Sequence, residues 1–261
     1  MLQVLWYSEK FLWAANLVGS GLVAWRLYSL DLYKTYRFFF LIMVLTAARS
    51  MALLPFGPRT PAYYEIWVST EPLLWMSYIL VVYELDSLVL KKYQGIYSLG
   101  RWFLFAAVAI SSIVALLSVM TVTSNALNSR QPLLYPYALF ERWAFTSLAI
   151  FLFLLLLLVA WFSVPLSRNL LTHITLYSGY FFINNVILLH WHARGKDAIV
   201  LTTDTRLLTA IACFACWVFL LSRSGEERVA SLRLGRSPLE ERRLLGQLQT
   251  LNSTLLRTAR K

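Results

Sequence analysis

The sequence predicts an all-α membrane protein: a polytopic transmembrane helix bundle of seven spans, followed by a short C-terminal cytoplasmic amphipathic helix. Apolar residues make up 59% of the 261 residues and charged residues only 14%, whereas soluble domains are typically about 45–50% apolar and about 25% charged. Three long segments, 102–129, 143–167 and 169–193, contain no charged side chain. A helix needs about 20 residues to cross a hydrocarbon core of about 30 Å, so each of these segments is long enough for one span.

Seven spans account for the pattern of apolar segments in residues 1–222, which we take as the transmembrane domain. They are predicted at 11–30, 36–55, 63–90, 102–122, 143–164, 169–190 and 205–222. The third span is the weakest of these predictions, because it contains four acidic residues: Glu65, Glu71, Glu84 and Asp86. Short connections favour antiparallel packing of helices that follow one another. The N-terminus lacks the basic region and the cleavage site of a signal peptide, so we expect the first helix to remain in the mature protein.

Orientation follows from the Lys and Arg residues of the predicted loops, which accumulate on the cytoplasmic side. Loops of the first half place six basic residues on one side and two, Lys10 and Arg59, on the other. The loops of the second half favour the opposite orientation. The basic residues directly after the seventh span restore the first one, so we expect the N-terminus outside and the C-terminus in the cytoplasm.

Ionisable residues at membrane depth are costly and need partners. Arg49 is predicted about 9 Å below the outer end of the second span, and Glu71 about 11 Å below the same face in the third. These helices should be antiparallel neighbours, so we expect an Arg49–Glu71 ion pair. Asn184 and Asn185 of the sixth span lie at similar depth. The four residues form either a ligand pocket open to the outside or a structural ion pair with amides that hold helices together.

Pro72 follows Glu71 directly and removes one hydrogen bond from the third span, which favours a kink. A second polar set is predicted near the inner face: Glu84 and Asp86 in the third span, and His173 in the sixth. A carboxylate–histidine pair at low dielectric is a possible proton site. Alternatively, both carboxylates reach the interface beside the basic loop that follows them.

Other motifs give no support for a cofactor, a metal or an enzymatic activity. Cys213 and Cys216 form a C-x-x-C inside an apolar helix, where packing is the better interpretation than redox chemistry. His190 and His192 point apart on a helix, which disfavours a metal site. One histidine within the core is too few for a bis-histidine haem, and no lysine lies in mid-helix seven for a retinal Schiff base. We therefore expect a non-enzymatic protein.

The tail, residues 223–261, carries nine basic and four acidic residues. A capping box at Ser237 with proline at the first helical position predicts a helix over 238–258. Its leucines form one stripe: Leu244, Leu248, Leu251 and Leu255. The stripe is too short to predict a coiled coil by itself. It fits self-association, docking on a protein partner or contact with the lipid bilayer, and nothing in it favours nucleic acid.

Two segments, WVSTEPLLWMSYILVVYELDSLVLKKYQGIYSLGRW and AWFSVPLSRNLLTH, together with the tail ending LNSTLLRTARK, resemble a group of bacterial seven-helix integral membrane proteins with no assigned activity. The resemblance covers nearly the whole chain. It implies a location in the bacterial cytoplasmic membrane and adds nothing about activity.

Three functions remain open at this point. The first is a sensor or receptor-like module, with the outer polar cluster as its input and the tail helix passing the signal to a separate partner. The second is a structural or assembly subunit of a larger membrane complex, and the third is a small-solute transporter. A proline beside an intramembrane charge is found in transporters, but the sequence shows no inverted repeat.

Overall fold

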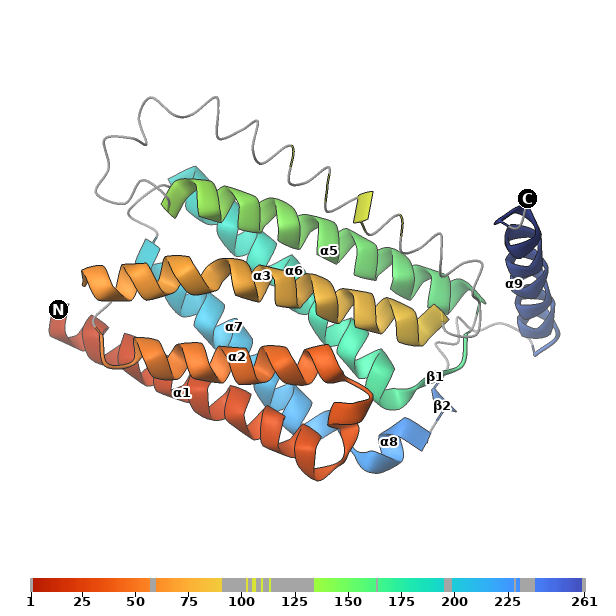
Figure 1. The fold of residues 1–261 in the computed structure, drawn as a ribbon, viewed down its shortest axis with the longest axis horizontal. Coiled ribbons are helices and arrows are strands. Elements are labelled where there is room, and N and C mark those ends of the chain that lie inside the picture. Colours follow the sequence, from red (N-terminus) through yellow and green to blue (C-terminus); the bar gives the residue numbers. More distant parts are fainter. Residues whose placement is uncertain are drawn as a thin grey trace.

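The computed structural model shows an all-α protein whose long helices form one bundle (Figure 1). It describes residues 2–56, 60–90, 134–162, 164–194, 199–227, 229–230 and 238–259, with five single positions between 102 and 113. Six long helices make up the bundle in this part of the chain: α1 (Leu2–Ser29), α2 (Arg37–Leu53), α3 (Pro61–Leu90), α5 (Leu134–Phe162), α6 (Arg168–Arg194) and α7 (Ile199–Leu220). The all-α prediction is confirmed.

Helices that follow one another in the sequence pack together, as the short connections predicted. In this way α1 contacts α2, α2 contacts α3, and α6 contacts both α5 and α7. Other contacts join bundle helices that are not consecutive: α3 contacts α6, and α1 packs along α7, which brings the first and last helices of the bundle together. Gly19 permits this approach, because a Cβ atom on it would lie 2.9 Å from Cδ2 of Phe214.

The predicted helix boundaries agree with six observed helices to within a few residues at most ends. The exceptions are the N-termini of α1, α5 and α7, which begin six or more residues before the predicted starts at 11, 143 and 205. The prediction began the fifth span after Glu141 and Arg142, because charged residues were taken to lie outside a span. In the structure α5 begins earlier and includes Glu141. Helix α3 continues through Pro72. The predicted span 102–122 falls outside the described residues except at five helical positions, of which Trp102, Phe105 and Ile113 are exposed.

The bundle has an apolar exterior and a partly polar interior. Large apolar side chains are exposed on the outer faces of the helices, including Val18, Trp25, Phe153, Leu157, Phe182 and Phe219. Polar and charged side chains are buried between the helices, including Asn16, Ser50, Glu71, Glu84, Asp86, Glu141, Asn169, His173 and Asn184. In water this distribution would expose large apolar patches, which soluble monomers rarely do. It is the distribution that a lipid environment favours.

Three of the described helical segments are long and apolar enough to cross a membrane: Pro61–Leu90, Phe140–Phe162 and Leu201–Leu220. Helix α2, with 17 residues, spans about 26 Å at 1.5 Å per residue and is shorter than a typical hydrocarbon core. Helix α6 is long enough but carries a row of polar side chains along one face. The described residues thus contain three segments of membrane-spanning character, and they do not confirm the predicted seven spans.

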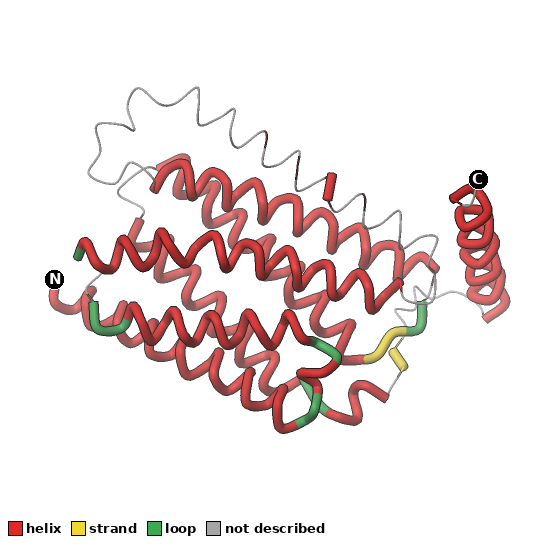
Figure 2. The backbone as a smooth tube through the Cα atoms, in the orientation of Figure 1, coloured by secondary structure: helices red, strands yellow, loops and turns green. Residues whose placement is uncertain are grey.

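The chain beyond α7 lies at one end of the bundle (Figures 1 and 2). Helix α8 (Arg223–Glu227) follows directly, and β2 (Val229–Ala230) pairs antiparallel with β1 (Leu166–Ser167). Helix α9 (Pro238–Ala259) confirms the predicted tail helix and runs across the direction of the bundle helices. Leu248 of the leucine stripe is buried in the bundle core, and α9 contacts α5.

Two polar contacts stabilise the chain around the C-terminal end of α1: one within the turn that follows α1 and one from α1 to the end of α7. Asp31, between α1 and the short 3-10 helix Leu32–Lys34, has a positive φ of 57°. Its carboxylate lies 3.1 Å from Nζ of Lys34, and this hydrogen bond and charge raise the pKa of the exposed lysine. Arg26 donates from Nε and Nη2 to the carbonyl of Leu221, at 3.1 and 2.7 Å. It thereby satisfies a carbonyl at the C-terminal end of α7 and places a cation at the negative end of the helix dipole.

Candidate functional site

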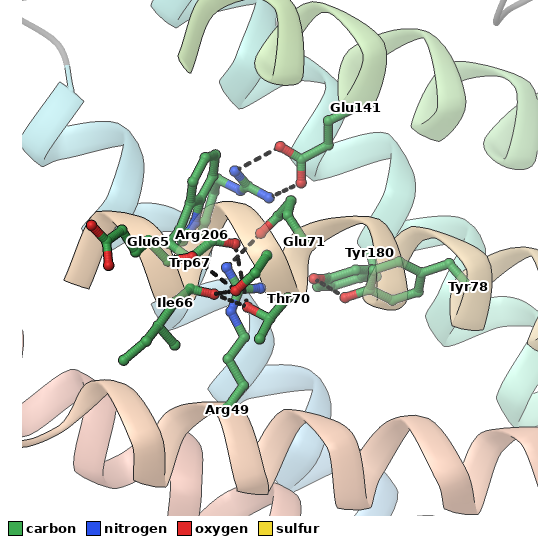
Figure 3. Close-up of polar contacts among 11 residues, drawn as sticks. Arg49, Glu65, Ile66, Trp67, Thr70, Glu71, Tyr78, Glu141, Tyr180 and Arg206 are labelled. Atoms are coloured by element: carbon green, nitrogen blue, oxygen red, sulfur yellow. Dashed lines mark hydrogen bonds and ion pairs between the residues drawn. The ribbon is translucent and has the colours of Figure 1, made fainter. Parts of the chain in front are cut away.

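Arg49 of α2 and Glu71 of α3 form an ion pair inside the bundle (Figure 3). The side chains are 11% and 5% exposed, so both charges are largely removed from solvent. The pair is the one expected from matching depths in two consecutive antiparallel helices. No described residue accepts a hydrogen bond from the buried Nε of Arg49, so within this part of the chain the guanidinium retains an unused donor.

A second ion pair lies beside the first. Arg206 of α7 binds both carboxylate oxygens of Glu141 of α5, with Nη1 3.1 Å from Oε2 and Nη2 bonded to Oε1. The Nε of Arg206 also donates to Oδ1 of Asn184 in α6 at 3.1 Å. Asn184 is held in turn by donating from Nδ2 to the carbonyl of Tyr180 at 2.8 Å. A guanidinium with three bonds and a carboxylate with two leave little of this pair unsatisfied.

We call Arg49, Glu71, Glu141, Asn184 and Arg206 the outer network, after the side on which the predicted topology places it. Glu71 lies close enough to act electrostatically on both Glu141 and Arg206. The network draws one residue from each of α2, α3, α5, α6 and α7, and its two positive and two negative charges cancel. Next to it, the hydroxyls of Tyr78 in α3 and Tyr180 in α6 lie 2.9 Å apart (Figure 3).

This arrangement has two chemical consequences. Removing one partner of a buried pair leaves an uncompensated charge and costs about 3–5 kcal/mol. One pair therefore holds α2 against α3, and the other holds α7 to α5, with Asn184 adding α6. A polar ligand that bonds to one of these charges weakens the bond to its partner and so changes the packing of two helices. The described residues contain no group of His, Cys, Asp and Glu side chains suited to a metal ion.

Sequence reasoning missed Glu141 and Arg206. Glu141 was left in the fourth connection, outside the predicted span 143–164, and Arg206 was counted with the loop charges although it falls just inside the predicted span 205–222. In the structure α5 and α7 begin earlier than predicted, so Glu141 and Arg206 each lie seven residues after the start of their helix. Asn185, which was predicted with Asn184, is half-buried and lies about 100° further round α6.

The inner polar set is divided by the structure into separate environments. Glu84 accepts hydrogen bonds from the backbone N–H groups of Phe38 and Phe39, at 3.1 Å each. It thus acts as a cap for the N-terminus of α2, although it belongs to α3. Neither oxygen of Asp86 and neither ring nitrogen of His173 has a hydrogen-bond partner in the part of the chain that the structure describes. The carboxylate–histidine pair considered for the proton site is therefore not formed here.

His173 is fully buried among aromatic rings. The ring centroids of Phe39 and Tyr36 lie 4.4 and 4.5 Å from its imidazole, and that of Trp217 lies 6.2 Å away. Going along α6, His173, Tyr177, Tyr180 and Asn184 follow spacings of four, three and four. They therefore share one face of the helix, which links the aromatic region with the outer network.

A third polar group, which the sequence did not predict, attaches α8 to the bundle. We call Tyr36, Asn169 and Glu226 the inner latch. The hydroxyl of Tyr36 donates to Oε2 of Glu226 at 2.9 Å, and Nδ2 of Asn169 donates to the same oxygen at 3.2 Å. Nδ2 of Asn169 also donates to the carbonyl of Ser222 at 2.8 Å. Gly225 is required for this contact, because a Cβ atom there would collide with the Asn169 amide.

The remaining motifs gain no partners that would suggest chemistry. Cys213 is buried and Cys216 exposed, and both are free thiols in α7. His190 is exposed near the end of α6, while the side chain of His192 lies outside the described residues. Comparison with protein-family profiles, curated proteins and solved structures gave no match.

Proposed function

We propose that this chain is a seven-span protein of the bacterial cytoplasmic membrane that acts as a non-enzymatic sensor or receptor-like module through a separate protein partner. Its N-terminus would lie outside and its tail in the cytoplasm. The outer network is the input, and the tail held by the inner latch is the output.

One observation carries this proposal: two helices connect the network with the latch. Helix α2 carries Arg49 near its C-terminal end, and Tyr36 stands directly before its first residue. Helix α6 carries Asn184 of the network and Asn169 of the latch. A change in the bonding of Arg49 or Arg206 that shifts either helix along its axis therefore changes the distance between the donors that hold Glu226. Coupling of this kind through rigid elements is typically worth about 0.5–2 kcal/mol.

The chemistry of the network indicates the class of ligand. Arg49 has an unused Nε donor, whereas both carboxylates are already bonded to guanidinium groups. The site therefore favours a small molecule with an acceptor group, such as a carboxylate or a carbonyl, over a cation.

Trypsin cleavage of the tail tests the coupling, because the sequence places three cleavage sites, Arg228, Arg233 and Arg236, within ten residues after Glu226. The full-length chain in lipid nanodiscs would be compared with Arg206→Gln and with Arg142→Gln. Arg142 neighbours Glu141 but takes no part in the network, so it is the matched control. We expect Arg206→Gln to accelerate cleavage about 2- to 30-fold, which corresponds to the coupling energy above, and Arg142→Gln to leave the rate unchanged.

A latch variant separates the two parts of the proposal. Glu226→Ala removes the acceptor directly and should accelerate cleavage without any change in the network. If Glu226→Ala accelerates cleavage while Arg206→Gln does not, the latch holds the tail but the network does not control it, and the sensor proposal is wrong. Chemical cross-linking tests whether the tail binds a partner. A protein that is cross-linked to the full-length chain, but not to a chain without residues 231–261, would support this role.

A structural or assembly subunit is the second candidate, and a specific observation favours it. Within the described residues each of the four network charges has an oppositely charged partner, as expected of side chains that only hold helices together. Stoichiometric co-purification with other membrane proteins, unaffected by Arg206→Gln, would support this function. A small-solute transporter would instead show uptake into liposomes that Glu71→Gln abolishes.

A further inference from the structure

Asp86 stands apart from the other buried carboxylates of the bundle. It is 0% exposed, and none of the described residues forms a hydrogen bond with either of its carboxylate oxygens. We propose that Asp86 is a proton-binding site that holds its carboxyl group in the neutral acid form inside the bundle. This inference does not depend on the sensor proposal.

The three other buried carboxylates within the described residues each have partners that stabilise their negative charge. Glu71 is paired with Arg49, and Glu141 with Arg206. Glu84 is only two residues from Asp86 in α3, but it accepts two backbone N–H bonds from the N-terminus of α2. An ionised carboxylate without such partners is very costly in an apolar interior, and such a group takes up a proton instead.

Among the described residues, the helices packed against α3 bring no charge to Asp86. On α2, Arg37 acts on Glu84, and on α6 the neighbouring titratable groups, His173 and Tyr177, are held among aromatic rings. The charged residues of α5, Glu141 and Arg142, lie near the opposite end of that helix. Within the part of the chain that the structure describes, burial is the one effect that the surroundings have on the Asp86 carboxyl.

The position of Asp86 means that its protonation state affects the packing at the inner end of the bundle. It lies four residues before Leu90, the last residue of α3, and two residues after Glu84, which caps the start of α2. Loss of the proton would place a bare negative charge on α3 at this point, next to helices α2 and α6 that carry the latch residues. The proton thus contributes to the packing at the inner end of the bundle.

Infrared spectroscopy of the full-length protein in a detergent without ester groups tests the proposal directly. A protonated carboxylic acid has a carbonyl-stretch band separate from that of a carboxylate. We expect this band at neutral pH in the wild-type chain and in Glu84→Gln, and its loss in Asp86→Asn. A wild-type spectrum without the band, or a band that persists in Asp86→Asn, would overturn the assignment.

Carbodiimide labelling supplies an independent readout. Dicyclohexylcarbodiimide reacts with a protonated carboxyl group in an apolar environment: the acid proton moves to a carbodiimide nitrogen, the carboxylate oxygen bonds to the central carbon, and the adduct rearranges to a stable N-acylurea. We expect one adduct, mapped by mass spectrometry to the peptide with Asp86 and absent from Asp86→Asn. Glu84→Gln is the matched control and should be labelled as the wild type is. Labelling of Glu71, Glu84 or Glu141 in preference to Asp86 would contradict the proposal.

Discussion

Replacing Arg206 by methionine should destabilise the bundle more than replacing its partner Glu141 by leucine. Residue Glu141 is 2% exposed, so Arg206→Met leaves a buried carboxylate with no guanidinium and should cost about 3–5 kcal/mol of unfolding free energy. The Arg206 side chain is 26% exposed and keeps its bond to Asn184, so it retains some solvation when Glu141 is lost. We expect Glu141→Leu to cost about 2–3 kcal/mol of unfolding free energy. This is the typical cost of losing hydrogen bonds between charged groups, when water partly solvates the guanidinium that remains.

The double variant is the decisive member of this series. It removes both charges together and replaces them with apolar groups, a change that is often neutral or stabilising for buried pairs. The single variants add to a loss of about 5–8 kcal/mol, so the unfolding free energy of the double variant should exceed the additive expectation by at least about 3 kcal/mol. The measurement is denaturant unfolding in detergent micelles, followed by tryptophan fluorescence. Additivity within about 0.5 kcal/mol would show that the two side chains do not stabilise each other and would refute the reasoning about the network.

Two further predictions concern helix packing and capping. Gly19→Val should separate α1 from α7, because the new Cβ atom meets Phe214 at 2.9 Å; overpacking of this kind costs about 1–3 kcal/mol, measured by thermal unfolding. Gly21→Val is its matched control, since no atom lies within 4 Å of a Cβ there, and equal losses for both would contradict the packing explanation. Glu84→Ala should cost about 1 kcal/mol through loss of the α2 cap, seen as faster amide exchange at Phe38 and Phe39; unchanged exchange would show that the cap contributes nothing.

The sequence predicted the interaction between Arg49 and Glu71 because it depends on local quantities. Helix rise fixes how deep each residue lies, and a short connection makes α2 and α3 antiparallel neighbours. The pair of Glu141 and Arg206 involves α5 and α7, which are not consecutive. Which face of each helix turns inward there depends on the packing of α6 between them.

Glu84 and Asp86 show the same limit within one helix. Their spacing places them on different sides of α3, but the spacing cannot say which side faces the start of α2. That decision gives Glu84 two backbone donors and leaves Asp86 with none. The inner latch could not be predicted from local sequence, since it joins Tyr36 and Glu226, which are 190 residues apart.

By itself the sequence determined the helical class, most helix boundaries and the polar residues within the apolar segments. Each of these follows from composition and periodicity over a single segment, where the length of a helix and the hydropathy of its residues suffice. Only the tertiary structure decided which buried charges are paired, which carboxylate caps a neighbouring helix and which stands alone. Those outcomes depend on the rotation of each helix about its axis and on contacts between distant segments, and both are set by side-chain packing in the bundle as a whole.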